Sequence, residues 1–209
     1  MDSIIFDLDG TLWDSRENIC KAWNEVIAQK YPELGELTVE RISEHMGKLL
    51  PDITRGLFPH LDEDTLNDVT KSCCEYENDY ISRIGGILYD GVEETLEALS
   101  KRYRLFIVSN CQEGYIEAFF AAHDLQKYFC DYECNGRTGL SKADNIKLIV
   151  KRNSLTDACY VGDTKLDGKS AKEAKIPFLW ASYGFGDSED FDVKLYNFTE
   201  LAEIFCKNT

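Results

Sequence analysis

The sequence has few of the features that mark secreted or membrane-spanning proteins. Its 209 residues contain no apolar run near the roughly 18 residues that a transmembrane helix needs. The segment 1–7 begins with an acidic residue after Met1, and it lacks the basic start and long apolar stretch of a secretory signal. We therefore expect a cytoplasmic protein without a membrane partner.

Basic residues are scarce relative to acidic ones. The chain has 23 Lys and Arg against 38 Asp and Glu, which gives a formal net charge of −15. A surface of this sign repels nucleic acid as a whole, so DNA and RNA are not expected partners. An anionic substrate would instead have to be held by a few local cations or by a metal ion.

Cysteine and histidine form no recognisable zinc pattern. The eight cysteines include no Cys-x-x-Cys pair, and the three histidines are scattered along the chain. Cys130 with Cys134 and the neighbours Cys73 and Cys74 come nearest to such a pattern, but we expect reduced thiols. No Gly-x-Ser-x-Gly segment surrounds Ser109, which argues against a serine hydrolase.

The remaining composition is that of a folded protein with one catalytic unit and an insert. Short, continuous apolar runs predict strands buried on both faces at 4–6, 104–109, 158–162 and 177–181. Segments with helical spacing alternate with them at 92–101, 115–123, 142–152 and 168–175. This alternation predicts an α/β fold, with a Rossmann-like parallel sheet core flanked by helices.

One long stretch, residues 15–84, breaks the alternation. It carries helical patterns, as at 17–30 and 64–83, and almost no strand signal. We therefore predict an inserted all-α cap domain at 15–84 and a catalytic core made of 1–14 and 85–209.

Polar motifs follow the predicted strands in order. They are DLDGT at 7–11, Ser109 with Asn110, Lys142, and GDTKLD at 162–167. Ligands of parallel α/β sheets collect at the carboxyl ends of the strands, so we expect these motifs to share one crevice.

The order and spacing of the four motifs resemble those of the haloacid dehalogenase-like superfamily. The resemblance covers nearly the whole chain, and the run WASYGFG at 180–186 is similar to that of the phosphoglycolate phosphatase-like branch. It implies a Mg²⁺-dependent phosphatase that hydrolyses a small phosphorylated metabolite, a phosphate monoester, through an aspartyl-phosphate. Whether the protein is a monomer or a homodimer is left open.

The proposed chemistry explains why carboxylates and cations are needed together. A phosphate monoester repels a nucleophile, so cations must surround its oxygens. Asp7 is the expected nucleophile, and Asp9 is expected to protonate the leaving oxygen and later to accept a proton from water. The resemblance implies that Asp7 and the backbone carbonyl of Asp9 bind Mg²⁺, that Asp163 completes the protein ligands and that Asp167 supports this shell.

Further residues are expected to bind the substrate. Ser109, Asn110 and Lys142 would hold the phosphoryl group, because they offer short polar donors and a compact positive charge. Thr11 is expected to fix the motif loop by a side-chain hydrogen bond. Lys48 lies where relatives have a specificity loop, and it either meets a second anionic group or is an exposed lysine at a helix end.

One departure from the family pattern concerns stability. Lys175 stands where relatives commonly carry Gly at a helix end. A left-handed cap at this position would cost Lys about 1 kcal/mol more than Gly.

Three alternative functions were weighed against the phosphatase. Asp9 together with Asp163 and Asp167 argues against a dehalogenase, which attacks carbon without a Mg²⁺ shell. A sugar-phosphate mutase is similar in its core, but such enzymes have a cap histidine shortly before an Ala-Trp pair, and here that stretch is ICKAW at 19–23. A non-catalytic module that binds a phosphorylated ligand is the third alternative, because function depends on the site rather than on the fold.

Overall fold

The buried strand at the N-terminus forms the centre of a six-stranded parallel sheet. The computed structural model describes residues 1–206, and the order of the strands in this sheet is β5-β4-β1-β6-β7-β8. All neighbouring strands are parallel. The strands are β1 (Ser3–Phe6), β4 (Arg104–Ser109), β5 (Phe129–Cys134), β6 (Ala158–Gly162), β7 (Phe178–Ala181) and β8 (Val193–Leu195). The predicted α/β class is confirmed.

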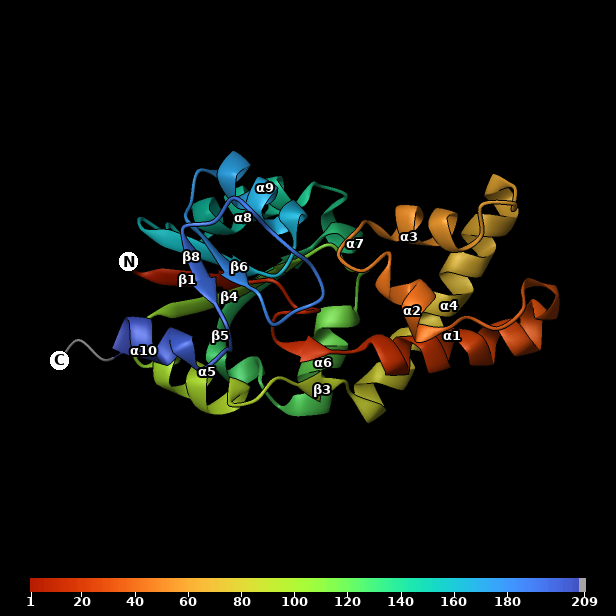
Figure 1. Cartoon of the computed structure of the whole chain (residues 1–209), viewed down its shortest axis with the longest axis horizontal. Coiled ribbons are helices and arrows are strands. Elements are labelled where there is room, and N and C mark those ends of the chain that lie inside the picture. Colours follow the sequence, from red (N-terminus) through yellow and green to blue (C-terminus); the bar gives the residue numbers. More distant parts are fainter. Residues whose placement is uncertain (207–209) are drawn as a thin grey trace.

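Helices cover both faces of this sheet (Figure 1). Ile4 and Phe6 of β1 face a core that includes residues of α5 (Val92–Ser100), α6 (Tyr115–His123) and α10 (Glu200–Cys206). Ile5 faces the opposite core, with residues of α8 (Lys142–Arg152) and α9 (Lys165–Ala174). Because both faces are buried, the central strands read as continuous apolar runs, and this made them predictable.

Residues 15–84 lie beside the sheet as a helical insert (Figure 1). The insert contains α1 (Arg16–Lys30), the 3₁₀ helix η1 (Pro32–Leu34), α2 (Val39–Ser43), α3 (Leu50–Leu57) and α4 (Glu63–Ile84). Its two connections to the sheet form an antiparallel ribbon of β2 (Trp13–Asp14) and β3 (Ile87–Leu88). We propose that this insert is the cap domain and that 1–14 and 85–209 form the catalytic core.

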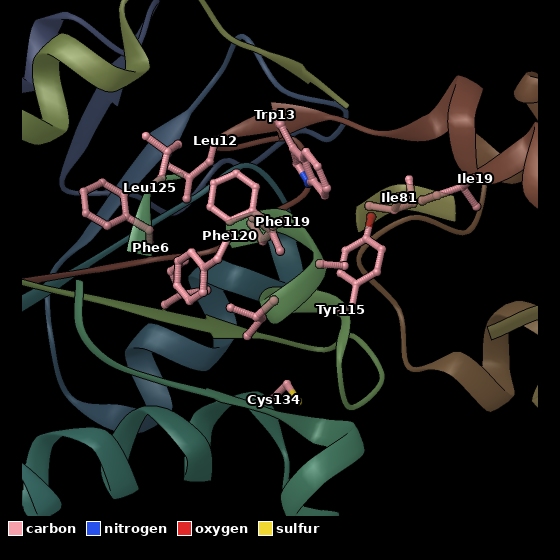
Figure 2. Packing of buried hydrophobic residues seen from close by; sticks show 14 of the residues in the cluster. Phe6, Leu12, Trp13, Ile19, Ile81, Tyr115, Phe119, Phe120, Leu125 and Cys134 are labelled. Carbon is pink, nitrogen blue, oxygen red and sulfur yellow. The ribbon is translucent and has the colours of Figure 1, made fainter. Parts of the chain in front are cut away.

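Aromatic packing holds the junction between the insert and the sheet. The ring centroid of Trp13 lies 4.9 Å from that of Phe119 and 5.8 Å from that of Tyr115, and all three residues are buried (Figure 2). Helix α6 is thereby anchored next to the strand ends. The same contacts place the hydroxyl of Tyr115 between the core and the insert.

Several boundaries differ from the sequence prediction. Strands β5 and β8 lie at the two edges of the sheet and lack long apolar runs, so periodicity did not reveal them. Helix α9 begins at Lys165 rather than at 168, because Thr164 and Asp167 form a capping box at its start. The short segments α7 (Asn135–Thr138) and η2 (Gln126–Tyr128) were also not predicted.

The left-handed helix end expected at Lys175 is present. Lys175 follows α9 with φ 62° and ψ 39°, and its backbone N–H donates to carbonyl oxygens of that helix. The expected cost relative to Gly, about 1 kcal/mol, therefore applies to the folded chain.

Within residues 1–206, no helix combines the length and the apolar character needed to cross a bilayer. The eight cysteines are unpaired, and Cys130 is exposed whereas Cys134 is buried.

Candidate active site

Asp7 stands at the carboxyl end of β1, and the tight loop that follows it leaves no room for larger side chains. Asp7 is buried, and its backbone N–H donates to the carbonyl oxygen of Val161 at 2.8 Å. Gly10 has φ +79°, and a Cβ atom there would lie 2.2 Å from Oδ2 of Asp163. Glycine is therefore required at this position, because the loop passes directly over the Asp163 carboxylate.

Thr11 does not play the loop-fixing role expected of its side chain. It is fully buried, and its hydroxyl has no hydrogen-bond partner among the described residues. The loop is held by backbone bonds instead, including one from the N–H of Thr11 to the carbonyl oxygen of Leu8 at 3.2 Å. The carbonyl oxygen of Thr11 also accepts a bond from the hydroxyl of Tyr183 at 3.0 Å.

Three buried carboxylates gather beneath the strand ends. One oxygen each from Asp7, Asp163 and Asp167 lies within 4.8 Å of the others. Oδ2 of Asp163 accepts hydrogen bonds from the backbone N–H groups of Phe185 and Gly186, at 2.7 and 3.2 Å. Oδ1 of Asp163 is buried and has no partner in residues 1–206. An oxygen of this kind needs a ligand that the protein itself does not supply.

Lys142 is the positive charge of this cluster. Its Nζ lies 3.0 Å from Oδ1 of Asp7 and 2.6 Å from Oδ1 of Asp167, and all three side chains are buried. Burial alone would lower the pKa of Lys142, but Asp167 and Asp7 together raise it above its usual value. The lysine therefore stays protonated and presents a fixed cation at the end of the sheet.

One lysine does not neutralise three carboxylates. Burial raises the pKa of Asp7 well above its usual value, and Lys142 opposes this shift. Burial and the nearby charge of Asp167 raise the pKa of Asp163 to about 7. With all three carboxylates ionised the cluster would carry excess negative charge, and this is one reason why the pKa values of Asp7 and Asp163 are raised. The clustered oxygens of the three carboxylates fit a hard divalent cation such as Mg²⁺.

The side chain of Asp9 points away from this cluster. Its Oδ1 accepts hydrogen bonds from Nε1 of Trp13 at 2.9 Å, the hydroxyl of Ser15 at 2.5 Å and the hydroxyl of Tyr115 at 2.9 Å. Burial raises the pKa of Asp9, and these three bonds oppose the rise. A metal role for Asp9 is therefore left to its backbone carbonyl, and its side chain is held at the junction with the insert.

The end of β4 touches the insert directly. Nδ2 of Asn110 donates to the carbonyl oxygen of Gly47 at 2.9 Å, while its buried Oδ1 has no partner among residues 1–206. The hydroxyl of Ser109 accepts a bond from the N–H of Cys111 at 3.3 Å. Nζ of Lys48 donates to the carbonyl oxygen of Glu44 at 3.1 Å and lies 3.0 Å from Nδ1 of His45.

A cavity between the sheet and the insert joins most of the predicted site residues. Its lining includes Asp7, Asp9, Lys48, Ser109, Asn110 and Lys142. Thr11, Asp163 and Asp167 are not part of the lining, although the two aspartates contact the cluster around Asp7. Three of the four motifs therefore line one cavity, and the fourth, at 162–167, lies next to it through the contacts of its aspartates with Asp7.

The cavity also contains a buried polar group that sequence reasoning missed. Glu77 of α4 is only 4% exposed, and its two oxygens accept hydrogen bonds from Nε1 of Trp23 and from Nε2 of Gln112. Burial raises the pKa of Glu77 to about 7. The signal was present in the sequence, because Glu77 continues the apolar stripe of α4 that includes Cys73, Cys74 and Ile81.

The raised pKa of Glu77 predicts a specific effect on stability. In the wild type, the unfolded chain ionises near the usual pKa of 4.5, while folded Glu77 stays neutral up to a pKa of about 7. Between these values the folded state binds more protons, so stability falls as pH rises. We expect the unfolding free energy of wild type, relative to Glu77→Gln, to drop by about 3 kcal/mol from about pH 4.5 to about pH 8.

Urea unfolding of both proteins across this pH range measures the difference. Taking the difference cancels the titration of all other groups that the two proteins share. A difference that does not change with pH would show that Glu77 ionises in the fold as it does in water.

The comparisons with known proteins agree with this geometry. A family model described as "Haloacid dehalogenase-like hydrolase" matches residues 4–181. A phosphoglycolate phosphatase of Vibrio parahaemolyticus is 25% identical, with 96% of this chain and 94% of that protein covered. A phosphoglycolate phosphatase of Rhodospirillum rubrum is 30% identical, with 88% of this chain and 80% of that protein covered.

Solved structures share the arrangement of sheet and insert. A haloacid dehalogenase-like family hydrolase from Streptococcus pneumoniae has a TM-score of 0.83 at 25% identity, and 98% of each chain is covered. A predicted phosphoglycolate phosphatase from Haemophilus somnus also has a TM-score of 0.83, at 20% identity, with 98% of this chain and 97% of that chain covered.

Proposed function

The chain belongs to the haloacid dehalogenase-like hydrolase family and is a phosphatase of that family, and we propose that it hydrolyses a small phosphate monoester with Asp7 as the nucleophile and Mg²⁺ as the cofactor. The observation that carries this proposal is the cluster at the end of β1. There Asp7 lies beside Lys142 and within 4.8 Å of oxygens of Asp163 and Asp167, and it lines the cavity below the insert.

The proposed reaction has two steps. A carboxylate oxygen of Asp7 attacks phosphorus, the bond from phosphorus to the ester oxygen breaks, and an aspartyl-phosphate forms. Water then attacks the same phosphorus, which releases inorganic phosphate and restores the carboxylate. Lys142 stabilises the phosphoryl oxygens through its fixed charge. Mg²⁺, held by Asp7, Asp163 and the carbonyl of Asp9 with support from Asp167, would neutralise further negative charge.

Asp9 is proposed to handle the proton in both steps. It donates a proton to the leaving oxygen and then accepts one from the attacking water. The raised pKa of Asp9 supports this role, because it leaves more of the acid form near neutral pH. To reach the substrate, its carboxyl group would leave the bonds with Trp13, Ser15 and Tyr115.

Substrate binding is proposed for residues on both sides of the cavity. Ser109, Asn110 and Lys142 would bind the phosphoryl group, with the hydroxyl of Ser109, the Nδ2 amide group of Asn110 and the ammonium group of Lys142 as donors. Nδ2 of Asn110 would exchange its bond to Gly47 for one to a phosphoryl oxygen. We propose no contact between the substrate and the side chain of Thr11. Its hydroxyl is unpaired, but Thr11 does not line the cavity. Lys48 remains a candidate contact from the insert. The insert would exclude water while phosphorus is transferred.

The role of Asp9 predicts a dependence on the leaving group. An alkoxide needs a proton to leave, whereas p-nitrophenolate leaves easily without one. We expect Asp9→Asn to lower kcat/KM for an alkyl phosphate by about 10²- to 10⁴-fold, and to lower it much less for p-nitrophenyl phosphate. Steady-state rates with both esters measure the difference, and equal losses would contradict a proton-transfer role.

The experiment that tests the proposed function is release of inorganic phosphate from p-nitrophenyl phosphate and short alkyl phosphates, with and without Mg²⁺. Mg²⁺-dependent release supports the phosphatase. Isomerisation of a sugar phosphate without net release would indicate the mutase alternative. Binding of esters without any turnover would indicate the non-catalytic module.

A further inference from the structure

Glu77 is a buried carboxylate at the insert side of the cavity. It comes from the middle of α4, and it lines the same cavity as Asp7 and Lys142. Its carboxyl group is held in place by Trp23 of α1 and by Gln112, which follows β4. Two elements of the insert and one loop of the core therefore position this single acid.

This carboxylate lacks a positive partner. Within residues 1–206 Glu77 forms no ion pair, and each of its oxygens accepts one hydrogen bond from a neutral group. A carboxylate removed from water without a cation costs several kcal/mol. Asp9 is close enough that its charge also raises the pKa of Glu77. The folded chain thus holds a buried acid that has two neutral hydrogen-bond donors but no cation beside it.

The surrounding wall offers little else to a polar ligand. The side chains from the insert that line the cavity are mostly apolar, namely Ile19, Ile42, Met46, Leu50 and Ile53. Lys48 also lines it, but its ammonium group contacts Glu44 and His45 of its own loop. Glu77 is therefore the strongest polar feature that the insert presents to a leaving group. The cavity is small, with a volume of about 60 Å³, and this favours a short leaving group.

We propose that Glu77 determines specificity by accepting a hydrogen bond from an ammonium or hydroxyl group on the leaving group of a short alkyl phosphate. This inference rests on the proposed phosphatase function. It names the substrate class as short aminoalkyl and hydroxyalkyl phosphates. An ester whose leaving group ends in a carboxylate, such as phosphoglycolate, would place like charges together in a low-dielectric site.

The proposed preference differs from the activity for which two relatives are named. The relatives from Vibrio parahaemolyticus and Rhodospirillum rubrum are called phosphoglycolate phosphatases, and their identity to this chain is 25% and 30%. It also opposes the expectation that Lys48 meets a second anionic group. The two residues favour leaving groups of opposite charge, so a matched set of esters distinguishes them.

The test uses four esters that differ in the terminal group. All four have a two-carbon leaving group: 2-aminoethyl phosphate, 2-hydroxyethyl phosphate, phosphoglycolate, and ethyl phosphate, which lacks a polar end and is one atom shorter. For wild type with Mg²⁺ at about pH 8, where Glu77 is ionised, we expect kcat/KM for the amino and hydroxy esters to exceed that for phosphoglycolate by at least about tenfold. In Glu77→Gln this ratio should fall by about tenfold, because the repelling charge is gone and an acceptor for the ammonium group is lost.

Two further variants keep the result interpretable. Glu75→Gln removes an exposed charge from the same helix and should leave the ratio unchanged. Glu77→Asp keeps the charge on a shorter side chain, so it should keep the preference for the amino ester over phosphoglycolate.

The outcomes separate the inference from the function on which it rests. Hydrolysis of all four esters with phosphoglycolate preferred, or a ratio unaffected by Glu77→Gln, overturns the inference and leaves the phosphatase intact. Absence of turnover with these esters and with p-nitrophenyl phosphate overturns the proposed function itself. A large loss of phosphoglycolate turnover in Lys48→Gln would assign the leaving-group site to Lys48 instead.

Discussion

Asp7→Asn is expected to reduce phosphatase turnover by at least about 10⁴-fold, because the amide oxygen cannot form the aspartyl-phosphate. The substitution keeps the size of a buried side chain and removes one charge from a cluster with excess negative charge. The fold should therefore survive, and the metal-free variant should be at least as stable as wild type. Release of p-nitrophenol with saturating Mg²⁺ measures the loss.

Two observations would complete this result. Acid-quenched wild-type reactions should contain a phosphoryl adduct on the peptide that carries Asp7, and the variant should contain none. Asp144→Asn is a suitable control, since Asp144 is exposed on α8 and its carboxylate bonds to the side chains of Ser141 and Lys147. Turnover that persists in Asp7→Asn at near the wild-type rate would refute the assignment of the nucleophile.

Asp163→Asn is expected to have opposite effects on stability and on activity. In the metal-free protein, Asp163 adds a third carboxylate to a cluster with one lysine, and its pKa is raised to about 7 by burial and by Asp167. Replacing it by Asn removes that repulsion and keeps an oxygen that accepts the bonds from Phe185 and Gly186. The metal-free variant should therefore unfold at a temperature about 3 °C or more above wild type at about pH 8.

Binding of Mg²⁺ should reverse this order. Mg²⁺ stabilises a protein to which it binds in the folded state, and this raises the unfolding temperature of wild type in a concentration-dependent manner. The variant should show little of this rise in unfolding temperature. At moderate Mg²⁺ concentrations its turnover should also fall by roughly 10²-fold or more. Thermal unfolding with and without Mg²⁺ tests both signs. An equal Mg²⁺ shift in both proteins would exclude Asp163 as a ligand.

The contrast between these variants follows from how the site is built. Asp7, Asp163 and Asp167 repel one another, and the fold tolerates this because Lys142, two backbone N–H groups and the helix cap at Thr164 bind their oxygens. The repulsion lowers the stability of the metal-free chain, and the same carboxylates would allow the site to bind a cation and an anionic ester. Substitutions that relieve the repulsion should therefore stabilise the chain while they remove its function.

The central part of the fold was predictable from the sequence because the relevant signals are local. Strands β1, β4, β6 and β7 are continuous apolar runs, since both faces of the sheet are covered. Each motif residue that follows them lies at a carboxyl strand end, and a parallel sheet brings such ends to one edge. The predicted meeting of Asp7 and Asn110 at one cavity follows from this rule, whereas Lys142 is the first residue of α8 and reaches the cavity from a helix.

The edge strands of the sheet and the ribbon next to the insert were not predicted from the sequence. Strand β8 has only three residues, and β5 mixes polar with apolar residues, because an edge strand has one neighbour instead of two. The ribbon of β2 and β3 pairs segments that are far apart in the sequence, so no local pattern identifies it.

By itself, the sequence determined the α/β class and the helical character of residues 15–84, and it supplied the strand-end residues for which we propose the chemistry, because periodicity and strand-end polarity are properties of short segments. Only the tertiary structure decided the surroundings of those residues. It turned the carboxylate of Asp9 toward Tyr115, left the hydroxyl of Thr11 unpaired and buried Glu77 beside Trp23 without a counter-ion. Burial and electrostatic environment arise from contacts between distant segments, and one segment does not contain them.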